Sequence, residues 1–555
     1  MKMSFQKLRL LMKKIFQIQI FLSILTFQLK LRSISETPTL TFSNELITAT
    51  VSGEGYKISS TTLTINQSGT YKLTGSCSEC NIEVKKSTTD VILILDSLTL
   101  SCSTTAPITL KKSTSVTIQL EGTSTITDLE NINNESTDEN FEGAAIKIKG
   151  EGNLIIEGTG TLNANGSSCK NGIKGNEKSM IKINSGEIII NAANSGLVSD
   201  GAIIINDGVL NINSNNDGIK SEPDSTDIES EGSITINGGT ININSKGDGI
   251  QVSNNLKITN GNIKITTLSG YNDKTFNSET MSCKGLKASK NENTNRIPSI
   301  IISGGTFNIN TPDDAIHSDD SITITSGIFI IFSGDDGIHA DTQVILGKEN
   351  GSNDDLSITI KYSNEGIEGI NVKIYSGSYN IYAMDDGING KSDSKANSPN
   401  IYVYGGEMYI NTESDGFDSN GDIFFYGGNI EVWGMNAHGL NEPIDHDGIL
   451  EIKDTNIFAG GTKGIHAVHM HIKKKNQNYI YSYSTISSDT NIYVYDGNNN
   501  LVYQTKTPKK VDYLFYTSNK VNSDFYFAND EGKIRKNFGI NIKLSFIFIL
   551  IFIIF

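Results

Sequence analysis

The sequence is poor in basic residues and in proline. It has 46 Lys and Arg residues against 62 Asp and Glu, which gives a formal net charge of −16. Phosphate binding requires clusters of Lys and Arg, so this balance argues against a nucleic-acid partner. It fits a cation-binding protein or an acidic secreted protein. With only 8 Pro but 53 Gly, and with many Asn, Ser, Thr and Ile residues, the composition favours short strands and turns over helices.

Cysteine is also scarce. The chain has five cysteines, and no second pair at metal-binding spacing accompanies Cys77 and Cys80. Structural zinc sites usually need four such ligands. We therefore expect a local disulfide or two buried thiols here, and the odd total leaves one cysteine over in an oxidising compartment.

Both ends of the chain are typical of secretory proteins. Residues 1–33 combine basic residues with an apolar stretch from Ile15 to Leu29, which predicts a signal peptide or, alternatively, a signal anchor. Residues 529–555 end in an apolar tail that is short for a bilayer span, so they predict a glycosylphosphatidylinositol (GPI)-type signal or a tail anchor. We expect a glycoprotein that is secreted or held at the extracellular face of the plasma membrane. Glycosylation sequons begin at Asn66, Asn134, Asn165 and Asn350.

A short phrase recurs between these ends, about every 26 residues. Each copy has a small residue, here called the pivot, followed by an apolar residue. The pivots are Gly172, Gly196, Gly218, Gly249, Gly285, Ala315, Gly337, Gly366, Gly387, Gly416, Gly439 and Gly464. A period of this size is typical of a solenoid. The intervening residues alternate apolar and polar with a period of two, which predicts strands, and they leave no room for βαβ helices.

The sequence therefore predicts an all-β, right-handed parallel β-helix, a solenoid with one coil per pivot, over residues 85–472. Residues 34–84 are expected to form an N-terminal strand region. Residues 473–528 are expected to form a small C-terminal β cap that covers the last coil. Recurring asparagines, such as Asn211 and Asn242, are expected either to form ladders along the stack or to face solvent. We expect a monomer.

Carboxylates are concentrated at the pivots between Asp313 and Gly421. Stacked coils would place them about 5 Å apart, where like charges destabilise one another unless some are protonated or a cation neutralises them. Ca²⁺ is the hard cation that oxygen ligands select in a secretory compartment. The predicted calcium ligands are Asp313, Asp314, Asp335, Asp336, Asp341, Glu365, Glu368, Asp385, Asp386, Asp415 and Asp418. Single Asp-Gly pairs at Gly218 and Gly249 are expected to be turn formers.

Three histidines, His317, His339 and His466, share the register two residues after a pivot. Stacked imidazoles can bind zinc. No cysteine joins them and the surrounding acids favour a hard ion, so packed or hydrogen-bonded histidines are the expected result.

The ordered phrases Asp313–His317, Asp335–Asp341, Glu365–Gly369, Asp385–Asn389 and Asp415–Gly421 resemble the bacterial carbohydrate-binding β-helix family typified by a polygalacturonate-binding protein. The similarity covers about residues 85–470. The resemblance implies a right-handed parallel β-helix, bound calcium, and binding of acidic plant-wall polysaccharide. The early coils depart from the family pattern, because Asn and Ser precede Gly172 and Gly196.

The favoured function is therefore non-catalytic, calcium-dependent binding of an acidic, pectin-like polysaccharide. Outward aromatic residues could stack on sugar rings, and the candidates are Tyr362, Tyr402, Tyr404, Tyr409, Tyr426 and Trp433. One alternative is a calcium-dependent polysaccharide lyase, with Lys361 or Lys391 as the base. The other is a surface adhesin that calcium only stiffens.

Overall fold

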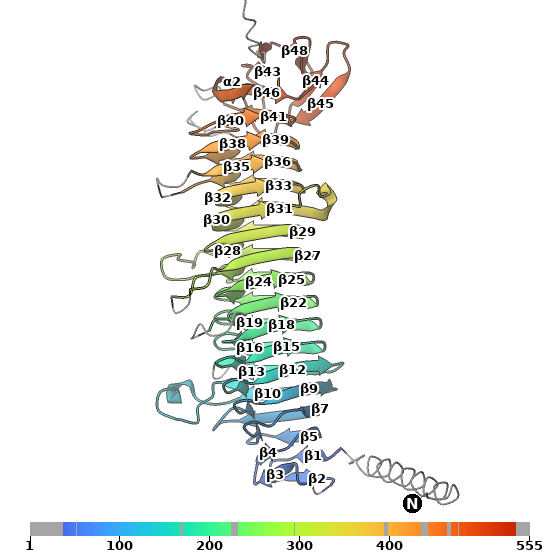
Figure 1. Cartoon of the computed structure of the whole chain (residues 1–555), viewed down its shortest axis with the longest axis vertical. Helices are drawn as coiled ribbons and strands as arrows, with labels where there is room; N and C mark the ends of the chain where they lie inside the picture. Colours follow the sequence, from blue (N-terminus) through green and yellow to red (C-terminus); the bar gives the residue numbers. More distant parts are fainter. Residues whose placement is uncertain are drawn as a thin grey trace, which may run out of the picture.

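The computed structural model describes residues 37–51, 53–166, 170–223, 231–292, 295–392, 394, 398–434, 442–462, 468–475 and 477–539. The predicted signal peptide, residues 540–555 of the predicted C-terminal signal, Cys169, His466, Gly439 and Gly464 lie outside this part. Among the described residues, no helix combines the length and apolar character needed to cross a bilayer. The protein is all-β and elongated (Figure 1).

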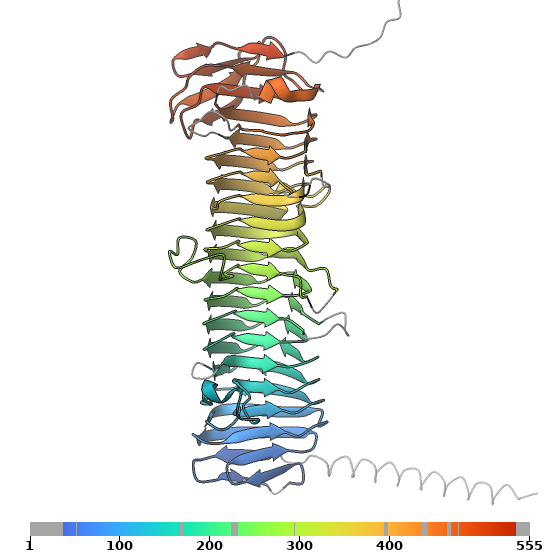
Figure 2. The same ribbon diagram turned by 90° about the vertical axis from the view of Figure 1, so that its left-hand side faces the viewer.

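Three ladders of parallel strands run along the molecule, and we call them A, B and C (Figures 1 and 2). Ladder A contains mostly short strands. These are β4 (Thr62–Ile65), β6 (Asn81–Val84), β8 (Ile108–Leu110), β11 (Ala144–Ile148), β14 (Asn171–Gly175), β17 (Leu197–Ser199), β20 (Ile219–Ser221), β23 (Ile250–Val252), β26 (Leu286–Ala288), β28 (Ile316–Ser318), the starts of β30 (Ile338–Leu346) and β32 (Ile367–Ile374), β34 (Ile388–Gly390) and β37 (Phe417–Ser419).

Ladder B follows ladder A in each layer of the molecule. It consists of β9 (Ser115–Glu121), β12 (Asn153–Gly158), β15 (Met180–Ile183), β18 (Ala202–Ile205), β21 (Ser233–Ile236), β24 (Asn255–Ile258), the starts of β27 (Ser299–Thr311) and β29 (Ser321–Ser333), the ends of β30 and β32, β35 (Asn400–Val403), β38 (Asp422–Phe425), β40 (Leu450–Ile452) and β42 (Ile472–Lys475).

Ladder C completes each layer. It consists of β5 (Gly69–Cys77), β7 (Val91–Cys102), β10 (Thr123–Asp128), β13 (Thr161–Gly166), β16 (Glu187–Ala192), β19 (Val209–Ser214), β22 (Thr240–Ser245), β25 (Asn262–Thr267), the ends of β27 and β29, β31 (Leu356–Tyr362), β33 (Ser378–Ala383), β36 (Glu407–Thr412), β39 (Asn429–Trp433) and β41 (Asn456–Gly461). Both β5 and β7 also reach ladder B at their N-terminal ends.

The prediction of an open solenoid, a right-handed parallel β-helix, is wrong. The strands of all three ladders belong to one 45-stranded sheet, which closes around the core as an elongated barrel. Long strands such as β27 cause the closure, because they continue from ladder B into ladder C without a break. A register shift and Gly305 at φ +107° let β27 turn this corner.

Antiparallel strands occupy both ends of the sheet. At the N-terminus, β1 (Thr39–Phe42) pairs with β2 (Ile47–Ala49), and β3 (Tyr56–Ser59) pairs with β4. Because β1 also pairs in parallel with β5, the N-terminal strand region is continuous with the ladders. A disulfide joins Cys77 to Cys80 here, one of the two expected arrangements.

A cap of antiparallel strands covers the C-terminal end. In the main sheet, β41 pairs with β46 (Tyr513–Thr517), followed by β43 (Tyr479–Ser482) and β49 (Asn537–Gly539). A separate four-stranded sheet contains β44 (Asn491–Tyr495), β45 (Leu501–Lys506), β47 (Tyr526–Asn529) and β48 (Gly532–Ile534). The described helices are short: the 3-10 turns Ile132–Asn134 and Asn353–Asp355, and α2 (Val468–His471).

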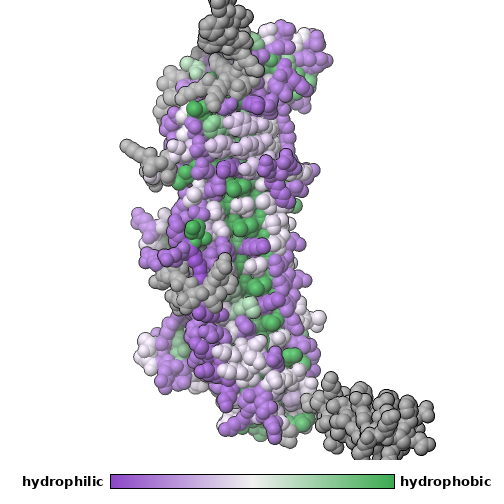
Figure 3. Space-filling model, in the orientation of Figure 1, coloured by the Kyte–Doolittle hydropathy of each residue, from purple (hydrophilic) through white to green (hydrophobic). Residues whose placement is uncertain are grey.

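The core consists of apolar columns inside the barrel. In ladder A, Ile219, Ile250 and Leu286 lie in register and are fully buried. The period-two alternation of the sequence produces this arrangement, since alternate strand residues point inward. On the face shown in Figure 3, hydrophilic residues surround a lengthwise band of apolar residues.

Asparagine ladders form on the outside of ladder C, as one of the two expectations had it. The Asn242 side-chain amide donates to Asn211 Oδ1 at 2.9 Å, and Asn244 donates to Asn213 at 3.2 Å. Each such bond links two successive layers, so these side chains add to the backbone pairing.

Close packing between layers explains the small pivots. A Cβ atom built on Gly218 would lie 2.6 Å from the carbonyl oxygen of Gly249 in the next layer. We expect Gly218→Val to destabilise the protein by about 1–3 kcal/mol or more, as overpacking does. Urea unfolding would measure this loss. A Val209→Thr control on the partly exposed outer face should change stability far less, and equal effects of the two changes would contradict this explanation.

Candidate functional site

Two columns of polar side chains follow the edge where ladder A begins. The first column holds the residue before each pivot, and the second holds the outward-facing second residue of each ladder-A strand. The pre-pivot column is Asp217, Asp248, Lys284, Asp314, Asp336, Glu365, Asp386 and Asp415. The strand column, set by the strand register, is Lys220, Gln251, Lys287, His317, His339, Glu368, Asn389 and Asp418.

The pre-pivot carboxylates tie successive layers together. The backbone N–H of Asp248 donates to Asp217 Oδ1 at 3.0 Å. The same bond runs from Asp336 N–H to Asp314 at 3.1 Å and from Asp415 N–H to Asp386 at 3.0 Å. One oxygen of each carboxylate is thus used structurally, and the other is available to a cation.

Lysines supply that cation in the earlier layers. Lys287 Nζ lies 2.9 Å from Asp248, and Lys220 Nζ lies 3.5 Å from Asp217. The single Asp-Gly pairs are therefore more than turn formers, because their carboxylates are paired with ammonium groups of the strand column.

Lys284 pairs with the first two adjacent acids, Asp313 and Asp314. Its Nζ atom lies 2.6 Å from both Asp313 Oδ1 and Asp314 Oδ2. The carboxylates and ammonium are all largely buried. Burial opposes the charge of Lys284, but the two aspartates outweigh it and raise the pKa of Lys284.

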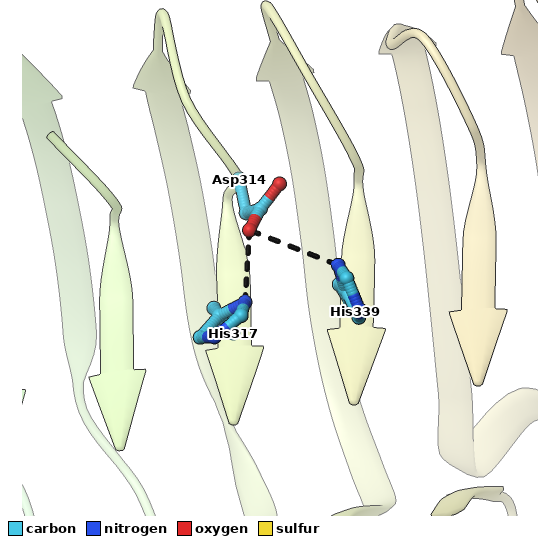
Figure 4. Close-up of side chains that lie close together, drawn as sticks. All are labelled: Asp314, His317 and His339. Carbon is cyan, nitrogen blue, oxygen red and sulfur yellow. Dashed lines mark ion pairs between the residues drawn. The ribbon is translucent and has the colours of Figure 1, made fainter. Parts of the chain in front are cut away.

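In the next two layers, histidines are the residues that pair with the pre-pivot aspartates (Figure 4). His317 Nδ1 lies 2.9 Å from Asp314 Oδ2. His339 Nδ1 lies 3.1 Å from Asp336 Oδ2 and 4.0 Å from Asp314 Oδ2, and Figure 4 draws the second of these pairs. Burial opposes protonation of both rings, but the aspartates raise the pKa of each, that of His339 to about 9. The packed or hydrogen-bonded histidines expected from the sequence are found at His317, whose Nε2 lies 3.0 Å from Asp319 Oδ1, and at His339, which pairs with Asp336.

Carboxylates outnumber cations in the later layers. Glu365 and Glu368 are buried, and Lys391 is their close lysine, with Nζ 3.7 and 3.5 Å away. Burial and then Glu368 raise the pKa of Glu365 to about 8. Burial and neighbouring aspartates raise the pKa of Asp386 to about 6.

The excess is largest around Asp415 and Asp418. Oxygens of Asp415, Asp418 and Asp445 lie within 4.8 Å of one another. Burial and then Asp386 raise the pKa of Asp415 to about 9 and that of Asp418 to about 7. Of the other predicted ligands, Asp335, Asp341 and Asp385 lie beside these columns with exposed side chains.

Asp445 and the buried Glu442 were not among the metal ligands predicted from the sequence. The layer after Gly416 has Pro443 at the pivot, since Phe417 pairs with Ile444, whereas Gly439 was expected there. Glu442 and Asp445 therefore extend the two columns. The phrase Glu442–Asp445 keeps the acidic pattern with Pro in place of Gly, and this signal could have identified them.

The predicted aromatic residues do not lie together. Tyr402, on ladder B, stacks on Phe424 with ring centroids 5.0 Å apart. Tyr404, 40% exposed, stacks on Tyr375 at 5.0 Å and contacts Tyr426 at 5.8 Å. These five rings form one stack, which we call the aromatic stack, on the face beside the acidic columns.

The other three candidates lie elsewhere. Tyr362 contacts Tyr271, with centroids 4.8 Å apart. Tyr409 lines a cleft of about 830 Å³ between ladder C and the cap. Trp433 is fully buried and its Nε1–H donates to Glu431 at 2.7 Å, so its ring is not available to a sugar.

Comparisons with known proteins address the function. A family model described as "Carbohydrate-binding domain-containing protein" matches residues 59–337 and 343–506. No curated protein matches the chain. A solved structure of a polysaccharide lyase-like protein from C. thermocellum, a gadolinium derivative, is similar at 25% identity and a TM-score of 0.38, over 46% of this chain and 98% of that one. Because the family match spans well over half of its residues, this chain belongs to the carbohydrate-binding domain-containing family.

Proposed function

We propose that this protein binds acidic polysaccharide of the polygalacturonate type, through Ca²⁺, without cleaving it. The carrying observation is the excess of carboxylates over cations among the described residues of the two columns from Glu365 to Asp445. In the earlier layers, lysines and histidines already neutralise the equivalent acids. Closely spaced buried carboxylates with raised pKa values are a strained arrangement that a divalent cation relieves.

The donor set fits calcium. Ca²⁺ binds oxygens at 2.3–2.6 Å, so ligands on opposite sides of one ion lie about 5 Å apart. The oxygens of Asp415, Asp418 and Asp445 lie within 4.8 Å of one another, which is inside this limit. When bound, the ion would supply open coordination positions for uronate carboxylates, a ligand that an acidic protein would otherwise repel.

The aromatic stack supports a role in sugar binding. Tyr402 and Phe424 lie on ladder B and Tyr404 directly follows it, on the face next to the one with the acidic columns, and aromatic rings commonly pack against sugars. A polysaccharide is long enough to contact two adjacent faces of the molecule.

The protonation of Lys391 argues against the lyase alternative. A lyase needs a neutral base, but Glu365 and Glu368 outweigh the effect of burial and raise the pKa of Lys391. The outward Lys361 has an exposed side chain on ladder C, away from the acidic columns. The termini favour a cell-surface or secreted protein, as proposed from the sequence.

The proposal is tested by retention on polygalacturonate, with Ca²⁺ and with EDTA. We expect retention that requires Ca²⁺, without the ultraviolet absorbance of unsaturated products. Absorbance growth would instead support a lyase. Thermal stabilisation by Ca²⁺ without retention would favour a structural adhesin, and neutral polysaccharides serve as the specificity control.

A further inference from the structure

We infer that Asp314, His317 and His339 form a second metal site, selective for a borderline transition metal such as Zn²⁺ and separate from the calcium site. All three residues are shown in Figure 4, where both imidazoles point to one aspartate from adjacent ladder-A strands. Imidazole nitrogen favours Zn²⁺ and similar ions, whereas Ca²⁺ prefers oxygen alone.

The donor geometry fits a tetrahedral ion. Ligands bound to Zn²⁺ at 2.0–2.2 Å lie roughly 3.3 Å apart. Asp314 Oδ2 lies 2.9 Å from His317 Nδ1 and 4.0 Å from His339 Nδ1, and Asp336 Oδ2 lies 3.1 Å from His339 Nδ1. The donor atoms of Asp314, His317 and His339 lie within 4.8 Å of one another, and a water molecule would complete a four-coordinate shell.

The outer partners of the rings also suit a metal site. His317 Nε2 lies 3.0 Å from Asp319 Oδ1, so a ring that gives up its Nδ1 proton on binding a metal ion can still donate from Nε2 to Asp319. This carboxylate–histidine arrangement is common behind zinc ligands. His317 Nδ1 is fully buried and makes no well-aligned hydrogen bond.

Lys284 limits the affinity of this site. Its ammonium lies 2.6 Å from the same Asp314 oxygen and would compete with a metal ion or repel it. Removing the lysine should therefore increase the metal affinity. The loss of a contact that is only structural would not increase it, so the direction of the change tests the inference.

The test is calorimetric titration of the metal-free full chain with Zn²⁺, together with the visible spectrum of the Co²⁺ form. We expect one site with the intense bands of tetrahedral Co²⁺. His317→Asn and His339→Asn should each weaken Zn²⁺ binding by at least about 10-fold, and Asp319→Asn, which leaves the ligands in place, by about 10-fold. Lys284→Gln should tighten it by about 10-fold.

Two controls keep the sites distinct. Asp415→Asn/Asp418→Asn should leave Zn²⁺ affinity unchanged, and the histidine variants should leave the calcium response unchanged. Zn²⁺ affinity that is the same in the wild type, the Asp319→Asn variant and both histidine variants would overturn the inference. So would an octahedral Co²⁺ spectrum. Asp319→Asn and Lys284→Gln decide the question if a histidine variant fails to fold.

Discussion

Replacing Asp415 and Asp418 together by Asn is expected to abolish both Ca²⁺-dependent thermal stabilisation and retention on polygalacturonate. The two carboxylates and Asp445 are the tightest all-oxygen cluster of the later layers, and amides would supply weaker ligands without charge. Wild-type protein should gain about 2.7 kcal/mol of stability at a Ca²⁺ concentration of 100 Kd. The variant should gain almost nothing in the same thermal or urea titration.

The matched control is Asp217→Asn, in an early layer where Lys220 already pairs with the carboxylate. This variant should lose some stability but keep the full response to Ca²⁺. The calcium assignment would be wrong if the double variant still responded as the wild type does. In the absence of Ca²⁺ the double variant should be more stable than the wild type, since it removes two mutually repelling acids.

Raising the pH from 5 to 9 is expected to destabilise the metal-free protein. Glu365, Asp415 and Asp418 have pKa values raised to about 8, 9 and 7 by burial and by their acidic neighbours. Unfolded carboxyl groups titrate near pH 4. Between about pH 4 and the folded-state pKa values, the folded protein holds protons that the unfolded chain has released. The stability that these protonated groups contribute is therefore present below about pH 4 and is lost as the pH rises through about 9.

One residue gives the scale of a single contribution, lost between about pH 4 and pH 6. Asp386 is buried and has a pKa of about 6, some two units above its unfolded value, which corresponds to at most about 3 kcal/mol. His339, with a pKa raised to about 9, acts in the same direction. Asp314, whose pKa is lowered, contributes with the opposite sign but only below about pH 4.

Urea unfolding at pH 5, 7 and 9, with and without Ca²⁺, measures this dependence. Saturating Ca²⁺ should flatten or reverse the trend, because a bound cation favours the ionised carboxylates. The Asp415→Asn/Asp418→Asn variant should show a shallower loss without metal. Stability that increases from pH 5 to pH 9 in metal-free wild type would contradict the carboxylate account.

The repeat could be predicted from the sequence because equivalent positions of stacked layers require similar residues. The pivot spacing, the period-two alternation and the double acids each reflect an interaction between equivalent positions of neighbouring layers. Except for β14, the ladder-A strands with a described pivot begin directly after it, and the acids form a column beside them. The same periodicity left the Asn211–Asn242 contact as one of two expected arrangements.

The closed sheet was not predictable in this way. Whether ladders remain separate depends on strands such as β27 that continue around a corner, and this depends on the backbone conformation at Gly305. Trp433 looked like an outward aromatic residue because its burial comes from the distant C-terminal cap.

The sequence alone determined the all-β repeat and the register in which carboxylates stack, since both follow from residues one layer apart. Only the tertiary structure decided which of the described carboxylates have a counter-ion beside them. Lys284 neutralises Asp313 and Asp314, and Lys287 neutralises Asp248. His317 and His339 contact Asp314 and Asp336. Several of these contacts join different layers, so the order of the acidic phrases in the sequence does not show which acids are paired. Charge pairing in three dimensions therefore moves the calcium proposal to the layers from Glu365 to Asp445.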